Sequence, residues 1–328
     1  MRPSSRGRSS SSGWSSSATP TGRGARDVAK TYYDANLSDA KGYALYAETL
    51  LRSNKPQDAL EIAGQLIQLN GEDAGGHEKR GRALLMLERM DEAVEELRRA
   101  VDLEPANAKY HMSLGQALHQ TGNVNQAALE FRAALKSAPE DAEAHVLLGM
   151  ALRDQSELEE AKTFLDKALE LDPKNARAWF EMGVLYNRQR KQIEAEAAFG
   201  NAVKYAPNES RYWYAYGEIY RVQSQIDHAI KAYRRAVEID PPFPKAVGKL
   251  GSVLVDNKQY DDAEPYLIQA IRKDPKNAVN YWYLGKAYAA QKKNRQAIDN
   301  YELFLKYAPK NDADRDKAKE LINQLKRK

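Results

Sequence analysis

Three of the five histidines have a type and spacing that could bind a metal or carry protons. The step along the chain from His77 to His111 equals the step from His111 to His145. Neighbouring packed helices lie about 8–10 Å apart, so nitrogens repeated from one helix pair to the next cannot share a zinc that needs each ligand at ~2 Å. We therefore interpret the histidines as packing residues, and we expect no metal site and no cofactor.

The signatures of catalysis are also missing from the sequence. The chain has no cysteine, which removes disulfides, thiolate ligands and a cysteine nucleophile together. It has no phosphate-binding loop, no dinucleotide fingerprint and no serine–histidine–aspartate set in a strand–turn–helix context. We predict that the protein is not an enzyme. A cytoplasmic location fits the lack of cysteine, of a secretory h-region and of an integral membrane segment.

A second candidate for chemistry is the stretch "RYWYAYGEIYR" at 211–221, which places five aromatic rings between two arginines. Such rings could stack nucleic-acid bases, hold a sugar, cage a methylated amine or fill a core. The choice depends on which rings the surrounding elements bury.

Those elements recur at the same spacing as the histidines, without insertions. Each repeat carries two apolar stripes at helical spacing, separated by a polar break: Trp179, Met182 and Tyr186 in one, Ala195 and Phe199 in the next. Three residue types recur in fixed places. They are Gly81, Gly115, Gly149, Gly183, Gly217, Gly251 and Gly285; Ala59, Ala93, Ala127, Ala161, Ala195, Ala229, Ala263 and Ala297; and Pro105, Pro139, Pro173, Pro207, Pro241, Pro275 and Pro309. The glycine and the alanine are expected to face each other where two helices cross closely.

With this pattern, and with a repeat length of about 34 residues, the chain resembles the tetratricopeptide repeat (TPR) superfamily. The resemblance implies an all-α, right-handed superhelical solenoid of antiparallel helix pairs, with first helices lining a concave groove. It predicts eight repeats over 40–311, a C-terminal capping helix over 312–328 and a possible N-terminal capping helix over 25–39. The repeats are 40–73, 74–107, 108–141, 142–175, 176–209, 210–243, 244–277 and 278–311. Pro265 falls inside a second helix, where we expect a kink or a late helix start.

The phase of each residue within its repeat predicts which rings are buried. Trp213, Tyr216 and Tyr220 take packing places, whereas Tyr214 should point into the groove. Collecting the groove places gives an apolar and aromatic middle with a basic rim, which would suit a protein or peptide segment with apolar anchors and acidic flanks. The predicted protein-binding residues are Met112, Val146, Met150, Arg177, Phe180, Val184, Arg188, Arg211, Tyr214, Arg221, Lys245 and Trp282. Replacing Phe180 and Tyr214 by alanine is expected to abolish binding with little effect on stability.

Two known binding modes of the superfamily find no match in the sequence. A chaperone carboxylate clamp needs Lys and Asn at the fifth and ninth places of a first helix, and no repeat has that pair. An asparagine ladder needs Asn at the sixth place, which no repeat has either. No chaperone carboxylate-clamp partner is therefore expected.

The N-terminal tail, 1–24, is rich in serine, arginine and glycine, and residues 1–30 have a net charge of about +5 against about −1 for the rest. This composition predicts disorder. Nucleic acid is a possible partner only through this basic tail. The sequence thus favours a non-catalytic scaffold or adaptor, possibly an assembly factor of a bacterial secretion, pilus or motility machine. The alternatives are a nucleic-acid-associated protein and a regulatory subunit of an enzyme.

Overall fold

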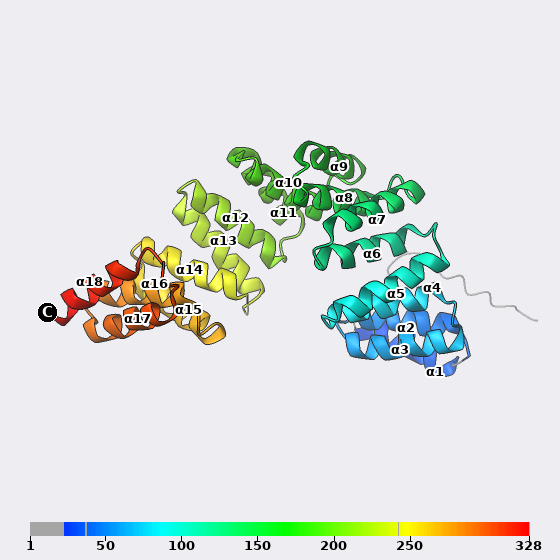
Figure 1. Cartoon of the computed structure of the whole chain (residues 1–328), viewed down its shortest axis with the longest axis horizontal. Coiled ribbons are helices and arrows are strands. Elements are labelled where there is room, and N and C mark those ends of the chain that lie inside the picture. The colour runs from blue at the N-terminus through cyan, green and yellow to red at the C-terminus, as the bar shows by residue number, and fades with distance from the viewer. Residues whose placement is uncertain (1–22, 37, 242, 328) are drawn as a thin grey trace, which may run out of the picture. The chain divides into compact units, whose positions relative to one another are not determined.

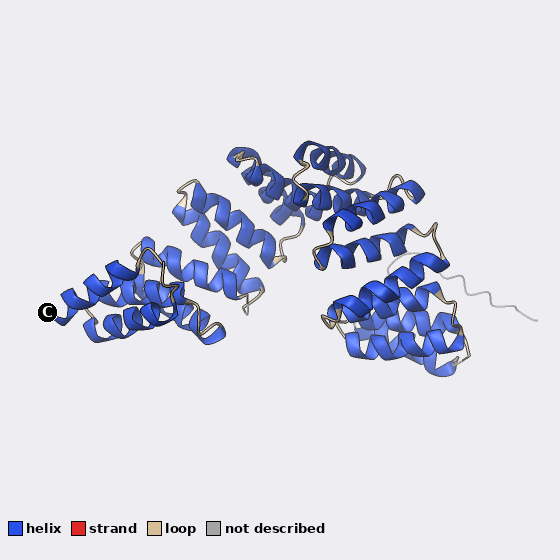
Figure 2. Ribbon diagram, viewed as in Figure 1, coloured by secondary structure: helices blue, strands red, loops and turns tan. Residues whose placement is uncertain are grey.

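The computed structural model describes residues 23–36, 38–241 and 243–327, and within these ranges all regular structure is helical (Figures 1 and 2). The tail predicted over 1–24 lies outside the described residues, apart from its last two positions. The helices are α1 (Arg23–Ala35), α2 (Ala40–Arg52), α3 (Pro56–Leu69), α4 (Ala74–Met86), α5 (Met90–Leu103), α6 (Ala108–Gln120), α7 (Val124–Ser137), α8 (Ala142–Asp154), α9 (Leu158–Leu171), α10 (Ala176–Arg188), α11 (Gln192–Tyr205), α12 (Ser210–Val222), α13 (Ile226–Ile239), α14 (Pro244–Asp256), α15 (Tyr260–Lys273), α16 (Ala278–Ala290), α17 (Asn294–Tyr307) and α18 (Arg315–Lys326).

The all-α fold expected from the repeats is confirmed. From α2 to α17 a first helix of 13 residues alternates with a second helix of 14 residues, and each type recurs once in every sequence repeat. The chain divides into two compact bodies, Met1–Pro139 and Glu140–Lys328, which we call the N-terminal body and the C-terminal body.

In the seven repeats that have the glycine, the first helix approaches its second helix closely at that residue. In the N-terminal body, Ala59, Ala93 and Ala127 have no exposed surface. A Cβ atom placed on Gly115 would lie 2.5 Å from Cε1 of Phe131, whose side chain is also fully buried. The missing side chain is therefore what allows the two helices to approach each other.

A tight turn joins the two helices of each pair. The second residue after the first helix has a positive φ, 59° at Glu88 for example, and the N–H of Arg89 donates to the carbonyl of Leu84. This backbone pattern caps the helix end and reverses the chain within a few residues. The positive-φ residues are Asn54, Glu88, Gly122, Ser156, Arg190, Ser224, Lys258 and Lys292.

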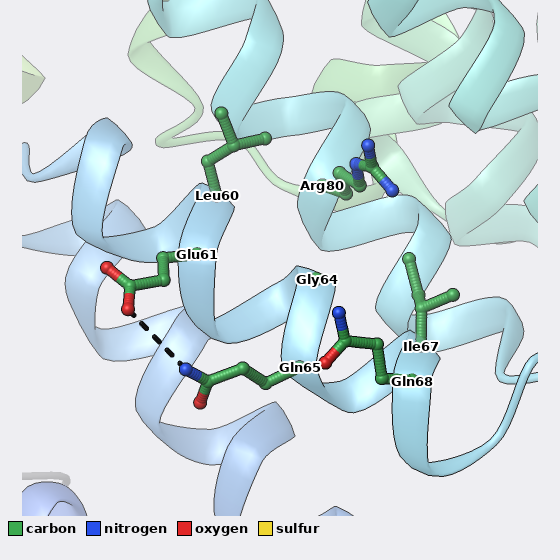
Figure 3. A pocket seen from close by; sticks show the side chains of 7 residues that line it. All are labelled: Leu60, Glu61, Gly64, Gln65, Ile67, Gln68 and Arg80. Atoms are coloured by element: carbon green, nitrogen blue, oxygen red, sulfur yellow. Dashed lines mark hydrogen bonds between the residues drawn. The ribbon is translucent and has the colours of Figure 1, made fainter.

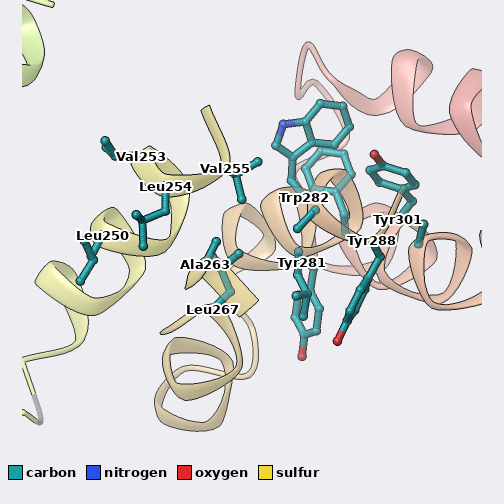
Figure 4. Close-up of a cluster of buried hydrophobic side chains, with 14 of the residues drawn as sticks. Leu250, Val253, Leu254, Val255, Ala263, Leu267, Tyr281, Trp282, Tyr288 and Tyr301 are labelled. Carbon is teal, nitrogen blue, oxygen red and sulfur yellow. The ribbon is translucent and has the colours of Figure 1, made fainter. Parts of the chain in front are cut away.

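Aromatic rings fill the core at the C-terminal end of the C-terminal body (Figure 4). The ring of Trp282 lies 5.5 Å from that of Tyr301 and 5.2 Å from that of Phe304. Helix α18 follows α17 and buries Ala318 and Ile322. Because these rings come from α16 and α17 together, the two helices share one packed interior.

Pro265 does not delay its helix. Helix α15 begins at Tyr260, in phase with the other second helices, and Pro265 lies inside it. The expectation of a late start is therefore wrong. The proline removes one N–H close to the helix start, while Ala263 and Leu267 on either side are fully buried and anchor the helix.

Candidate functional site

Rings at the fourth place of five repeats form a hydrogen bond with the loop that precedes their own helix. Nδ1 of His111 lies 2.6 Å from Oε2 of Glu130, and its Nε2 lies 2.9 Å from the carbonyl oxygen of Pro105. Trp213 donates in the same way to the carbonyl of Pro207, at 2.9 Å. The interpretation of this place as a packing position is confirmed, because histidine and tryptophan make the same contact.

The other rings of the 211–221 stretch are also engaged within the fold. The hydroxyl of Tyr220 donates to that of Tyr216 at 2.6 Å, and Trp213 packs 6.3 Å from the ring of Tyr216. All three side chains are half-buried. Burial raises the pKa of Tyr220, and the hydrogen bond from its hydroxyl to Tyr216 adds to the effect. These rings therefore serve packing, as their phase predicts.

Three of the predicted binding residues are buried, so the expectation that a partner can contact them directly is wrong. Val146 has no exposed surface, and Phe180 and Trp282 each expose 8%. The ring of Phe180 stacks 4.7 Å from that of Tyr212, and the guanidinium of Arg211 lies 4.9 Å above it. Side chains of the following repeat thus cover a place that phase alone marks as available.

The remaining apolar members of the predicted set are half-buried. Met150 and Val184 lie in the C-terminal body, whereas Met112 lies on α6 of the N-terminal body. The candidate site therefore consists of residues of the C-terminal body alone.

Much of the predicted basic rim is already paired. Arg177 forms an ion pair with Glu143. Arg188 donates to Asp154 at 2.8 Å and to the carbonyl of Arg153 at 2.7 Å. These arginines join successive first helices, so they stabilise the stack before any partner arrives.

Glu218 on α12 is the shared partner of three neighbouring side chains. It accepts hydrogen bonds from the hydroxyl of Tyr233 and from Arg221, the latter at 3.0 Å, and lies 3.7 Å from Nζ of Lys249. Burial works against its ionisation, but these hydrogen bonds and cations outweigh burial and lower the pKa of Glu218. Arg221 is therefore also committed to an internal partner.

Two cations of the predicted set differ from the others. Arg211 and Lys245 are exposed, and neither forms an ion pair with any residue that the structure describes. The half-buried ring of Tyr214, on the same helix as Arg211, lies 5.8 Å from the ring of Tyr233 and 5.4 Å from that of Phe243, two residues before Lys245. Burial raises the pKa of Tyr214 to about 12, so its hydroxyl is neutral at physiological pH.

We name Arg211, Tyr214, Phe243 and Lys245 the α12–α14 patch. It combines two partly exposed rings with two cations, a combination that can receive an apolar side chain and carboxylates. Sequence reasoning named three of these residues and missed Phe243. The available signal was an aromatic residue at a place where other repeats have Asp, Asn or Glu.

The N-terminal body has an ionic network of its own that sequence reasoning also missed. Glu78 is fully buried, and Arg82 and Lys109 lie 3.2 Å and 3.3 Å from its Oε1. Arg82 also reaches Glu48, at 2.7 Å. Burial would raise the pKa of Glu48, but the hydrogen bond and charge of Arg82, with Lys109, lower it to about 2. The network ties α2, α4 and α6 together.

A notch of about 520 Å³ lies beside α3 in the same body (Figure 3). Gly64 forms part of its wall and would have open space around a Cβ atom. On one side, Nε2 of Gln65 donates to Oε1 of Glu61 at 3.5 Å. On the other side, Nε of Arg80 lies 3.4 Å from Oε1 of Glu96. Glu61, Gln65 and Arg80 in the notch thus already have partners, and none of the described residues that line it is aromatic.

Two other kinds of site are absent from the described part of the chain. No group of three or more His, Cys, Asp or Glu side chains there is placed to hold a metal ion. None of the helices in that part is both long enough and apolar enough to cross a membrane.

Family models match the chain over almost all of its repeats. One tetratricopeptide repeat model matches residues 45–108, 79–142 and 112–176, and a second matches 152–219. The chain belongs to the tetratricopeptide repeat superfamily. A model described as the TPR domain of cytochrome c-type biogenesis protein H matches residues 202–315. The matched models all describe repeat domains, and no catalytic family is indicated.

Solved TPR structures share the fold. The chain is similar to the APC/C hetero-tetramer Cut9–Hcn1 (TM-score 0.66, 17% identity), covering 80% of this chain and 52% of that one, so it spans about half the length of that relative. YrrB, described as a TPR protein with an unusual peptide-binding site, is 25% identical (TM-score 0.52), covering 60% of this chain and 98% of that one. PilF of Pseudomonas aeruginosa is 20% identical (TM-score 0.59), covering 65% and 96%. A search of curated proteins finds no match.

Proposed function

We propose that this TPR protein is a non-catalytic scaffold that binds a segment of a partner protein on the first-helix face of the C-terminal body. The α12–α14 patch is the observation that carries the proposal. Its two cations have no ion-pair partner among the described residues, whereas the neighbouring Arg177, Arg188 and Arg221 do. A preorganised array of helices loses little conformational freedom when a flexible segment docks on it, which favours binding.

The predicted residues divide into two roles in this proposal. Arg211, Tyr214 and Lys245 contact the partner directly, and Met150 and Val184 extend the contact along α8 and α10. The buried residues Val146, Phe180 and Trp282 hold the binding helices in place from beneath. Residues 40–311 act as eight repeats, with capping helices at both ends.

The comparisons support the binding role at different levels. YrrB is described as having a peptide-binding site, and it covers 60% of this chain. Residues 202–315 match the TPR domain of a cytochrome c-type biogenesis protein, and this range includes the whole α12–α14 patch. The finer form of the proposal is a cytoplasmic assembly factor that presents one protein to a larger machine.

A pull-down with two variants tests the proposal. Tyr214→Ala should lose the proteins that the wild-type chain captures from its own cells, because the ring supplies apolar contact at the centre of the patch. Ile193→Ala is the matched control, since Ile193 is 80% exposed on the second helix α11 and should capture the same proteins as wild type. Equal capture by both variants would refute the assignment of the site.

A further inference from the structure

Phe243 occupies a place that is polar in the other repeats. The residue before each first helix is Asp39, Asp73, Asn107, Asp141, Asn175, Glu209, Phe243 or Asn277. Asp, Asn, Ser and Thr are favoured there because their side chains accept a hydrogen bond from the first turn. Asn175, for example, accepts one from the N–H of Ala178, at 2.9 Å. Phe243 forgoes that bond, and α14 has no side-chain cap.

The ring of Phe243 packs at the surface instead. It lies 5.4 Å from the ring of Tyr214 with the two planes near perpendicular, and it is half-buried. Tyr214 in turn lies on the fully buried Tyr233. Phe243 is unfavourable as a helix cap but adds a partly exposed ring to the surface. Such a departure from local sequence preference is expected where a surface serves binding.

The charges beside these rings favour one kind of ligand. Arg211 and Lys245 form no ion pair within the described ranges, although Glu209 and Asp240 lie close to them in the chain. The guanidinium of Arg211 is held over the rings of Phe180 and Tyr212, at 4.9 Å and 5.7 Å. Its position is thus fixed by packing while its charge stays available to a carboxylate.

We propose that Phe243 is a specificity-determining contact residue of the α12–α14 patch. The paired rings of Tyr214 and Phe243 take one aliphatic or aromatic side chain of a partner segment, and Arg211 and Lys245 pair with carboxylates on either side of it. This inference rests on the proposed function and adds to it the chemistry of the partner. The N-terminal network is a weaker candidate, because Arg82 and Lys109 already bind Glu48 and Glu78.

Selection from a random peptide library displayed on phage tests the inference with the full chain as target. Enriched peptides should carry an apolar residue flanked by Asp or Glu. Measured by fluorescence anisotropy, Phe243→Asn should weaken the binding of these peptides by about tenfold or more, as expected for a central aromatic contact. The same variant should unfold no earlier than wild type, because asparagine restores the missing helix cap.

A second variant does not depend on the cap. Arg211→Glu with Lys245→Glu changes two exposed side chains and should lose the acidic peptides, while Ile193→Ser should bind them like wild type. Loss of affinity in Phe243→Asn without loss of stability would separate a contact role from a structural one.

The outcomes that contradict the inference differ from those that contradict the proposed function. The inference alone would be overturned by peptides whose binding is lost in Tyr214→Ala but unchanged in Phe243→Asn. It would also be overturned by selected peptides that are not enriched in Asp or Glu. Selection of no peptide that is sensitive to Tyr214→Ala would overturn both. Binding of labelled single-stranded RNA, or self-association of the chain, that is lost in Phe243→Asn would assign the patch to another occupant and also overturn the inference.

Discussion

Adding a single methyl group should distinguish a glycine at a helix crossing from a glycine on an open helix face. In Gly115→Ala the new Cβ would lie 2.5 Å, 2.7 Å and 3.0 Å from three ring atoms of Phe131, which is fully buried and cannot swing away. In Gly64→Ala, on α3 of the same body, the new Cβ would have no neighbour within 4 Å. The two changes are chemically identical, so only the surroundings differ.

The expected magnitudes follow from two opposing effects. Alanine favours a helix over glycine by about 1 kcal/mol, which both variants gain. Overpacking costs about 1–3 kcal/mol, and the three close ring contacts place Gly115→Ala at the upper end. Gly115→Ala should therefore lose about 1–2 kcal/mol, and Gly64→Ala should gain about 0.5–1 kcal/mol.

Amide hydrogen exchange read by mass spectrometry is the suitable assay, because a long repeat protein does not unfold in a single two-state step. Peptides covering α6 and α7 should exchange faster in Gly115→Ala, and peptides covering α3 should exchange more slowly in Gly64→Ala. Equal protection of α6 and α7 in Gly115→Ala and wild type would refute the close crossing as the reason for the repeated glycine.

Two further predictions concern stability. Phe180→Ala should cost about 3–5 kcal/mol, because it empties a site enclosed by Phe199 and Tyr212; unchanged exchange in α10–α12 would contradict this. The second prediction concerns acid. Because the pKa of Glu48 falls from its ordinary 4.5 to about 2 on folding, its contribution to stability is complete above pH 4.5 and is lost as the pH falls toward 2. Over that range, the protection of α2–α4 from hydrogen exchange should depend less on pH in Glu48→Gln than in wild type. The same pH dependence in both proteins would contradict a stabilising role of the network.

The position of a residue within its repeat predicted the helices well because the recurring residues are set by backbone geometry. An alanine that recurs in all eight repeats and a glycine that recurs in seven of them indicate a close helix crossing, and Gly115 and Ala127 lie at such a crossing. The fourth-place rings follow the same logic, since His111 and Trp213 reach the same loop carbonyl from the same backbone position.

Phase could not predict which groove side chains are covered by their neighbours. Phe180 is buried because the next repeat supplies Tyr212 and Arg211 at that spot, and these two residue types are not set by the repeat. The pairing of Arg177 with Glu143 likewise depends on which charge the preceding helix carries. Phe243 was readable in principle, as the one apolar residue in a column of helix caps, but its contact with Tyr214 needs the fold.

The most direct test of the central claim is site-specific photocrosslinking inside living cells. A photoreactive phenylalanine analogue at Tyr214 should give a discrete crosslinked partner, and the same analogue at Ile193, on the second-helix side of the C-terminal body, should give none. A partner captured at Ile193 and not at Tyr214 would contradict binding on the first-helix face.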